Sequence, residues 1–146
     1  MANKFFIFVS FSVLVGCSPI MIKSNIQGRC LLLEKDQYLW QGRAAVYSGE
    51  FFISSLKKPQ VGIMKEIVTS INRGQRVKIV KVLKDANGSW GEFLRIQVEI
   101  QDGPYAGTIA DIPVHAPYHP REKWTKEFTL DPNAIEFNED VVVPCS

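Results

Sequence analysis

The side chains that could do chemistry are few and scattered in this sequence. His115 and His119 are four residues apart, a spacing that would place two zinc ligands on one side of a helix. Pro113, Pro117 and Pro120 exclude a regular helix there, because proline lacks the N–H group that a helix interior needs. No carboxylate or cysteine stands at ligand spacing from the two histidines. We therefore expect a surface loop here and no metal site.

Four acidic residues near predicted turns cannot be paired into a general acid and a general base by their spacing. They are Asp85, Glu92, Asp102 and Asp111. We expect them to be turn and surface residues. The Gly-x-Ser-x-Gly pattern is absent, and no Ser-His-Asp constellation is legible. The sequence thus predicts a protein that is not an enzyme and that holds no cofactor.

The first sixteen residues have the three parts of an export signal. Lys4 is their only charge, and residues 5–15, FFIFVSFSVLV, form an apolar run. This run is shorter than the roughly 20 residues that span a bilayer, but it fits the apolar region of a signal peptide. The quartet Leu14-Val15-Gly16-Cys17 resembles the lipobox of bacterial lipoproteins. An ordinary signal peptide with a chance cysteine and an uncleaved anchor are the two alternatives.

The lipobox resemblance implies an address and an anchor. It implies that residues 1–16 are removed and that the Cys17 sulfur carries a diacylglycerol, with a further amide-linked chain. Stable anchoring needs more than one acyl chain, which this arrangement supplies. Ser18, rather than Asp, follows Cys17, and in a Gram-negative envelope this implies the outer membrane, facing the periplasm. We expect residues 17–27 to be a short tether.

The resemblance also explains an odd number of cysteines. If Cys17 is used by lipid, Cys30 and Cys145 remain as an even pair. An oxidising compartment favours a disulfide between them, which would close a single domain over residues 28–146. Two buried or free thiols are the alternative.

The charge of the mature chain is nearly balanced. The sequence has 17 basic and 15 acidic residues, and removal of Lys4 with the leader leaves 16 basic ones. Long-range attraction to nucleic acid needs a clear basic excess. We therefore expect no nucleic-acid partner.

The rest of the chain is typical of short strands separated by tight turns. The expected strands cover residues 28–33, 43–53, 75–84, 90–101, 107–112, 128–130 and 135–143. Residues 61–71 are ambiguous between helix and strand, and we expect a helical turn followed by a strand from Glu66. Residues 85–89, DANGS, predict a hairpin turn between two of the strands, since Asn87-Gly88 suits positive φ angles.

The return strand of that hairpin has the clearest pattern. Four apolar residues alternate with four polar ones: Leu94, Ile96, Val98 and Ile100 with Arg95, Gln97, Glu99 and Gln101. A period of two predicts an antiparallel strand that is buried on one face only.

Two turns resemble those of bacterial SH3-like domains. Residues 72–82, NRGQRVKIVKV, resemble the entry into the barrel, and residues 102–107, DGPYAG, resemble a later turn. The resemblance covers residues 66–112 and implies a small antiparallel barrel. We therefore expect a mainly β fold, with flanking strands added to an SH3-like core.

Aromatic residues stand beside the turns of this expected barrel. The candidates for a binding surface are Trp90, Tyr105, Tyr118 and Trp124. In SH3-like domains such loops form a groove for an extended peptide or a glycan strand. The alternative is that the rings close the ends of a small core. Trp124, flanked by Lys123 and by Thr125-Lys126, is the best candidate for exposure.

Together these features predict a lipid-anchored envelope protein that acts as a non-enzymatic binding or assembly module. The SH3-like resemblance implies peptidoglycan or another envelope protein as its partner. A hydrolase inhibitor or immunity-type lipoprotein, and an accessory subunit of an envelope machine, are the alternatives.

Overall fold

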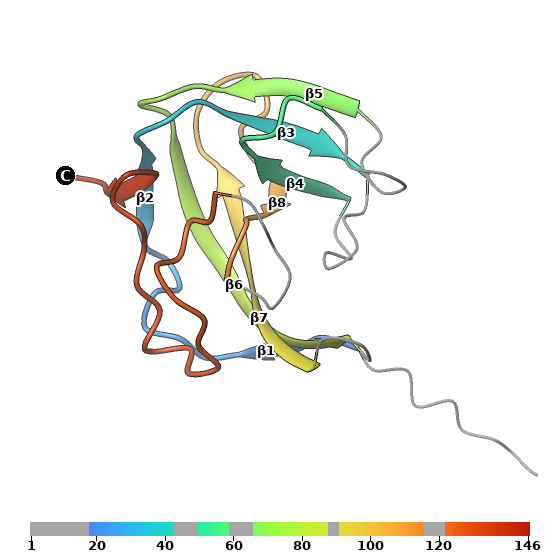
Figure 1. Cartoon of the computed structure of the whole chain (residues 1–146). Helices are drawn as coiled ribbons and strands as arrows, with labels where there is room; N and C mark the ends of the chain where they lie inside the picture. Colours follow the sequence, from blue (N-terminus) through green and yellow to red (C-terminus); the bar gives the residue numbers. More distant parts are fainter. Residues whose placement is uncertain (1–17, 43–49, 59–65, 88–90, 116–121) are drawn as a thin grey trace, which may run out of the picture.

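The computed structural model describes residues 18–42, 50–58, 66–87, 91–115 and 122–146 (Figure 1). Every regular element within these ranges is a strand. The strands are β1 (Ile20–Ile22), β2 (Cys30–Leu33), β3 (Gln37–Gln41), β4 (Phe51–Ser54), β5 (Glu66–Ile71), β6 (Arg76–Asn87), β7 (Gly91–Ile100), β8 (Ile109–Asp111) and β9 (Val142–Pro144).

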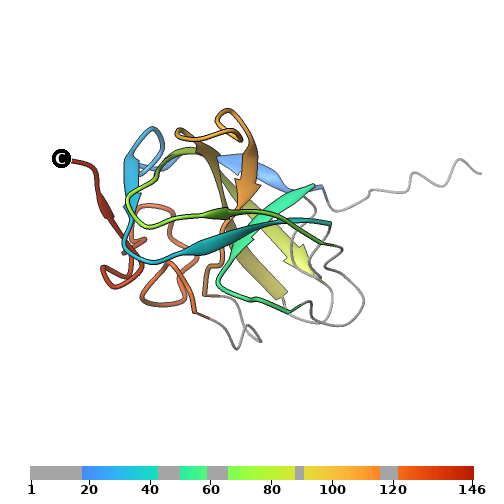
Figure 2. The same cartoon turned by 90° about the horizontal axis from the view of Figure 1, so that it is seen from above.

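All nine strands belong to one sheet. Eight follow the order β5-β3-β4-β8-β7-β6-β2-β9, and β1 pairs with β6 outside this path. Neighbouring strands are antiparallel except β4 and β8, which are parallel. The sheet curls into an open half-barrel (Figures 1 and 2). The expectation of a mainly β, barrel-like fold is confirmed.

The β6–β7 hairpin is the longest pairing in the sheet. Its register runs from Val77 opposite Ile100 to Asn87 opposite Gly91, so the predicted hairpin is confirmed, while residues 88–90 lie outside the described part. A bulge shifts the register between Ile79 and Lys81. An extra residue on one strand bends that strand and increases its twist. The bulge therefore contributes to the curl of the sheet.

The apolar core lies on one face of this curled sheet. It gathers side chains from most strands and from the carboxyl-terminal segment into one buried cluster, including Leu31, Leu39, Ile79, Val98 and Trp124. The alternating apolar residues of β7 belong to it as predicted, because Leu94, Ile96, Val98 and Ile100 are all buried.

The predicted disulfide between Cys30 and Cys145 is present, with the two Cα atoms 5.4 Å apart. Cys30 begins β2 and Cys145 directly follows β9, and these two strands are neighbours in the sheet, with Leu31 opposite Pro144. Their separation of 115 residues makes the closed loop nearly as long as the domain. Chain-entropy arguments assign such a loop about 4–5 kcal/mol of stabilisation.

The prediction of a free tether over residues 17–27 is wrong from Ile20 onward. Ile20 pairs with Lys84 and Ile22 with Val82, so this stretch is a strand of the sheet. The turn that follows is also fixed, since Ser24 Oγ donates to the Pro132 carbonyl. Ile26 is fully buried. Three residues are too few to show a periodic pattern in the sequence. β1 forms because it pairs with the part of β6 around Val82–Lys84.

The predicted strands near the carboxyl terminus are also largely wrong. Residues 128–130 form no strand, and of residues 135–143 only the last two lie in one, β9. Asp131 and Asn138 explain this, because their side-chain oxygens accept hydrogen bonds from the N–H groups of Asn133 and Asp140. Such local bonds compete with strand pairing and favour turns. Apart from β9, the described residues of this segment form one isolated bridge, between Thr125 and Phe137.

Two further predictions are settled in part. The strand expected from Glu66 is present as β5, while residues 61–65 lie outside the described part. The strand expected over residues 43–53 is described only at its end, as β4. β3 was not predicted, since its sequence QYLWQ is short and alternates poorly.

Candidate functional site

The prediction that Trp124 is exposed is wrong. Its side chain is fully buried in the apolar core. Its backbone is tied on both sides, since its N–H donates to the Pro113 carbonyl at 2.8 Å and its carbonyl accepts from the Asn138 N–H at 2.7 Å. Lys123 and Lys126 beside Trp124 suggested an exposed residue. Instead, the Trp124 ring packs into the core together with side chains of the carboxyl-terminal segment, such as Ile135 and Val141.

The other predicted aromatic residues do not form a described groove. Tyr105 is half-buried and packs against the core. Trp90 and Tyr118 lie outside the described residues, as does Cys17. Of the four candidates, the two that the structure describes therefore act at least partly as core packing.

The two turns that carried the SH3-like resemblance lie against each other. Arg76 donates to Asp102 three times: from its backbone N–H to Oδ2 at 2.7 Å, from Nε to Oδ2 at 3.1 Å and from Nη2 to Oδ1 at 2.7 Å. The side-chain hydrogen bond from Arg76 is the main reason that the pKa of the Asp102 carboxyl lies below its ordinary value. The Arg76 side chain itself is exposed.

Gly103 is required in this arrangement. Its φ is +82°, a conformation that other residues rarely adopt, and an added Cβ would lie 2.9 Å from Gln75 Nε2. The same Gln75 amide donates to the Asp102 carbonyl at 3.3 Å. The two turns therefore fix each other at one end of the β6–β7 hairpin through the hydrogen bonds of Gln75 and Arg76 to Asp102.

A second ion pair is buried on the face of the sheet opposite the apolar core. Arg95 Nη2 donates to both carboxylate oxygens of Asp111 at 2.9 Å, and Arg95 Nη1 donates to Asp85 Oδ2 at 3.2 Å. The exposed fractions of these side chains are 2% for Arg95, 1% for Asp111 and 14% for Asp85. The period-two pattern of β7 placed Arg95 on the half of the strand that is not core. The expectation that Asp85 and Asp111 are turn and surface residues is wrong, because Asp85 lies in β6 and Asp111 is buried in β8.

Aromatic and aliphatic side chains bury the same face. Trp40 and Phe52 stack with ring centroids 6.3 Å apart, and Phe93 and Leu83 are buried as well. Each of the stacked rings is the chain neighbour of a core residue, Leu39 or Ile53, and successive side chains of a strand point to opposite faces. This face is therefore partly covered as well, around β3, β4 and Arg95 of β7, whereas Lys78 and Lys81 of β6 are exposed. Sequence alternation alone did not reveal this cover.

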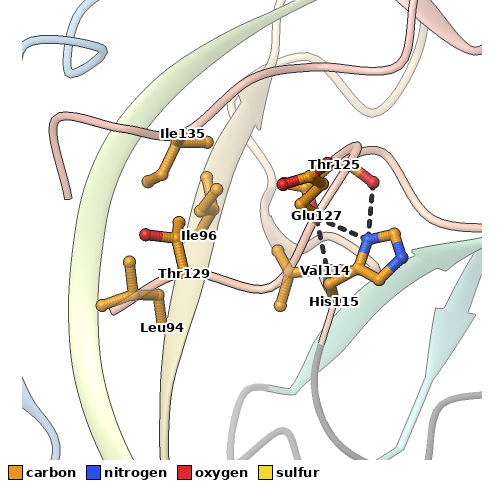
Figure 3. Close-up of a pocket in the computed structure, with 8 residues that line it drawn as sticks. All are labelled: Leu94, Ile96, Val114, His115, Thr125, Glu127, Thr129 and Ile135. Carbon is orange, nitrogen blue, oxygen red and sulfur yellow. Dashed lines mark hydrogen bonds between the residues drawn. The ribbon is translucent and has the colours of Figure 1, made fainter. Parts of the chain in front are cut away.

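A hollow opens beside the carboxyl-terminal segment (Figure 3). It is lined by Leu94, Ile96, Val114, His115, Thr125, Glu127, Thr129 and Ile135. Its volume is about 10 Å³, which is room for roughly one water and far below the roughly 300–1,000 Å³ of ligand pockets. This hollow does not fit a small-molecule substrate.

His115 has a structural role at the edge of this hollow (Figure 3). Its backbone N–H donates to Thr125 Oγ1 at 2.8 Å, and its Nδ1 lies 2.7 Å from the Thr125 carbonyl oxygen. The ring thus ties residues 113–115 to the carboxyl-terminal segment. Within the described ranges no three side chains are grouped to hold a metal ion, and His119 lies outside them.

The exposed features of the sheet are an edge and a few apolar side chains. β5 is the last strand on one side of the sheet and pairs only with β3 among the described strands. Large apolar side chains are exposed at Ile20, Met21, Ile67, Ile109, Phe128 and Leu130. These were not predicted as site residues, and an unpaired edge depends on strand order, which no local pattern shows.

Comparison with protein-family models, with curated proteins and with solved structures finds no match for this chain. None of the described residues forms a helix with the length and apolar character needed to cross a membrane.

Proposed function

We propose that this chain is a bacterial envelope lipoprotein whose β domain acts as a non-enzymatic binding or assembly module. The anchoring half of the proposal rests on the Leu14-Val15-Gly16-Cys17 quartet behind an apolar leader. The Cys30–Cys145 disulfide supports it, because such bonds form and persist in oxidising compartments such as the bacterial periplasm. The partner is an extended peptide, from peptidoglycan or from another envelope protein.

The observation that carries the binding half is the outer edge of β5, with which no other described strand pairs. A strand at the edge of a sheet presents unpaired N–H and C=O groups, which an extended peptide can pair with as an added strand. β5 offers six residues for such pairing, and Ile67 and Ser70 on it are exposed. This edge replaces the predicted aromatic groove as the candidate peptide site, because Trp124 belongs to the core.

The anchor is tested with Cys17→Ala. We expect this variant to lose incorporation of labelled palmitate and to accumulate as unprocessed precursor, since no thiol is left to carry the lipid. Normal acylation of the variant would refute the lipoprotein proposal.

The binding edge is tested by crosslinking in cells. A photoreactive residue at Ser70 on β5 should give discrete crosslinked species that mass spectrometry identifies as peptidoglycan peptide or one envelope protein. Ile67→Lys should reduce these species, because a charge on an edge strand opposes strand addition. Ile109→Lys is the matched control, as it adds the same charge at an apolar residue of similar exposure on β8. Equal loss in both variants would exclude the β5 edge as the site.

A further inference from the structure

The lipid anchor and the first strand are separated by very little chain. β1 begins at Ile20, and Ile20–Ile22 are paired to β6. Three residues of fully extended chain span at most about 11 Å. If Cys17 carries the lipid, the Ile20 Cα therefore lies within about 11 Å of the Cys17 Cα, whatever conformation the residues between them adopt. The domain has no tether that would let it stand away from the bilayer.

The side chains at this place are apolar and exposed. Ile20 is 65% and Met21 is 63% exposed, the two largest values among the exposed large apolar residues of the described chain. Successive residues of a strand point to opposite faces, so both faces of β1 are open to solvent. β1 therefore exposes apolar side chains on both of its faces.

The surroundings of β1 extend this apolar character. The turn after β1 is bonded to residues 132 and 133, through Ser24 to the Pro132 carbonyl and through the Asn25 N–H to Asn133 Oδ1. The segment that makes these bonds also exposes Phe128 and Leu130. Figure 1 shows the carboxyl-terminal segment reaching the same lower end of the molecule as β1.

Two lysines lie beside β1. Lys84, the partner of Ile20 in the sheet, is paired with Glu92 at 2.9 Å, and Lys23 is exposed directly after the strand. The two most exposed residues of β1 itself are apolar, and they supply the contact considered below.

We propose that β1 docks on the phospholipid bilayer through Ile20 and Met21, so that the lipidated domain sits with this end against the membrane. The proposal rests on the proposed lipoprotein anchor. Apolar side chains gain free energy when they leave water for the acyl boundary of the interface. The docked orientation holds β8, which lies in the upper half of Figure 1, away from the lipid.

The test uses the lipidated, oxidised mature protein in phosphatidylcholine vesicles. Met21→Cys and, as the matched control, Ile109→Cys are each labelled with an environment-sensitive fluorophore. Ile109 is a comparably apolar residue, 40% exposed, on β8. Some vesicles carry lipids with a nitroxide quencher just below the headgroup. We expect the label at position 21 to shift to the blue and to be quenched several-fold more than the label at position 109.

Two failures remain distinguishable in this design. Equal emission and equal quenching at the two positions, in protein whose palmitate content is normal, would overturn membrane docking and leave the lipoprotein proposal intact. Absence of palmitate from the wild-type protein would instead refute the anchor. A mass measurement that shows the Cys30–Cys145 bond intact in both variants confirms that each is folded before labelling. Replacement of phosphatidylcholine by anionic lipid should change the quenching little, and strong dependence on anionic lipid would overturn the apolar contact.

Discussion

The protein contains two arginine–aspartate pairs of similar geometry in different surroundings. Arg95 and Asp111 are nearly completely buried, and Arg95 also reaches Asp85. Arg76 and Asp102 also form two side-chain hydrogen bonds, but the Arg76 side chain lies in solvent. A buried charge loses its hydration and depends on its partner, whereas an exposed charge keeps most of its water. The buried pair should therefore be far less tolerant of change than the exposed pair.

The largest effect is expected when one buried partner is removed. Asp111→Ala removes the carboxylate that accepts two hydrogen bonds from the buried Arg95 guanidinium, and we expect a loss of about 3–5 kcal/mol in the free energy of unfolding. Urea denaturation measures this loss. Asp102→Ala, which removes the exposed partner, is the matched control and should lose much less. Equal losses in the two variants would show that the buried pair is no less tolerant of change than the exposed pair.

A conservative change at each arginine sharpens the comparison. Arg95→Lys keeps the positive charge but cannot bond both oxygens of Asp111 and Asp85 at once, so we expect a loss of about 1.5–3 kcal/mol. Arg76→Lys should cost less, because water replaces the missing hydrogen bonds. Denaturation of both variants under one set of conditions gives the difference, and a larger loss for Arg76→Lys would contradict the comparison.

Replacement of both buried partners by apolar residues should cost little. Arg95→Met combined with Asp111→Leu removes the charges together, and their site is already lined by Phe93 and Leu83. Such exchanges are often neutral or stabilise a protein by about 1–4 kcal/mol. Asp85, which is 14% exposed, loses its hydrogen bond from Arg95 in this variant, and this loss offsets part of the gain. A loss as large as that of Asp111→Ala would show that the pair itself is essential to the fold.

The smallest effect is the pH dependence of the exposed pair. The folded-state pKa of Asp102 lies below its ordinary value of 3.8, mainly because of the Arg76 side-chain hydrogen bond. The ionised form thus stabilises the fold above pH 3.8, and this contribution is lost as the pH falls through the lower folded-state pKa. Denaturation from about pH 5 to about pH 2 should show a steeper loss for the wild type than for Asp102→Asn. Parallel curves would show that Asp102 is not linked to stability.

Local patterns predicted the parts of the fold that depend on neighbouring residues. The alternation in residues 94–101 and the Asn-Gly turn signal determine the β6–β7 hairpin, because side-chain period and turn chemistry act over a few residues. The disulfide was predicted from the number of cysteines and from the oxidising compartment that the lipobox resemblance implies. β1 and β3 were not predicted, and β9 was predicted only as the end of a longer strand over residues 135–143, because these three strands form by pairing with residues distant in the chain.

Burial of particular side chains was the least predictable feature of the candidate site. Lysine neighbours suggested exposure of Trp124, yet this ring fills the core under a segment that has almost no strand pairing. The polar half of β7 suggested solvent around Arg95, yet Trp40, Phe52 and Phe93 are buried on that face as well. In both cases the deciding contacts come from residues distant in the chain.

The sequence alone determined the strand character of the chain, the central hairpin and the pairing of Cys30 with Cys145, and it predicts a leader that ends in a lipobox-like quartet. These properties follow from composition and from short-range periodicity. The tertiary structure decided which strand is an edge, that the expected tether joins the sheet at Ile20, and that one Arg–Asp pair is buried while the other is exposed. Strand order and burial arise from contacts between residues that are distant in the chain. These contacts form only when the whole sheet has folded, so short-range patterns do not contain them.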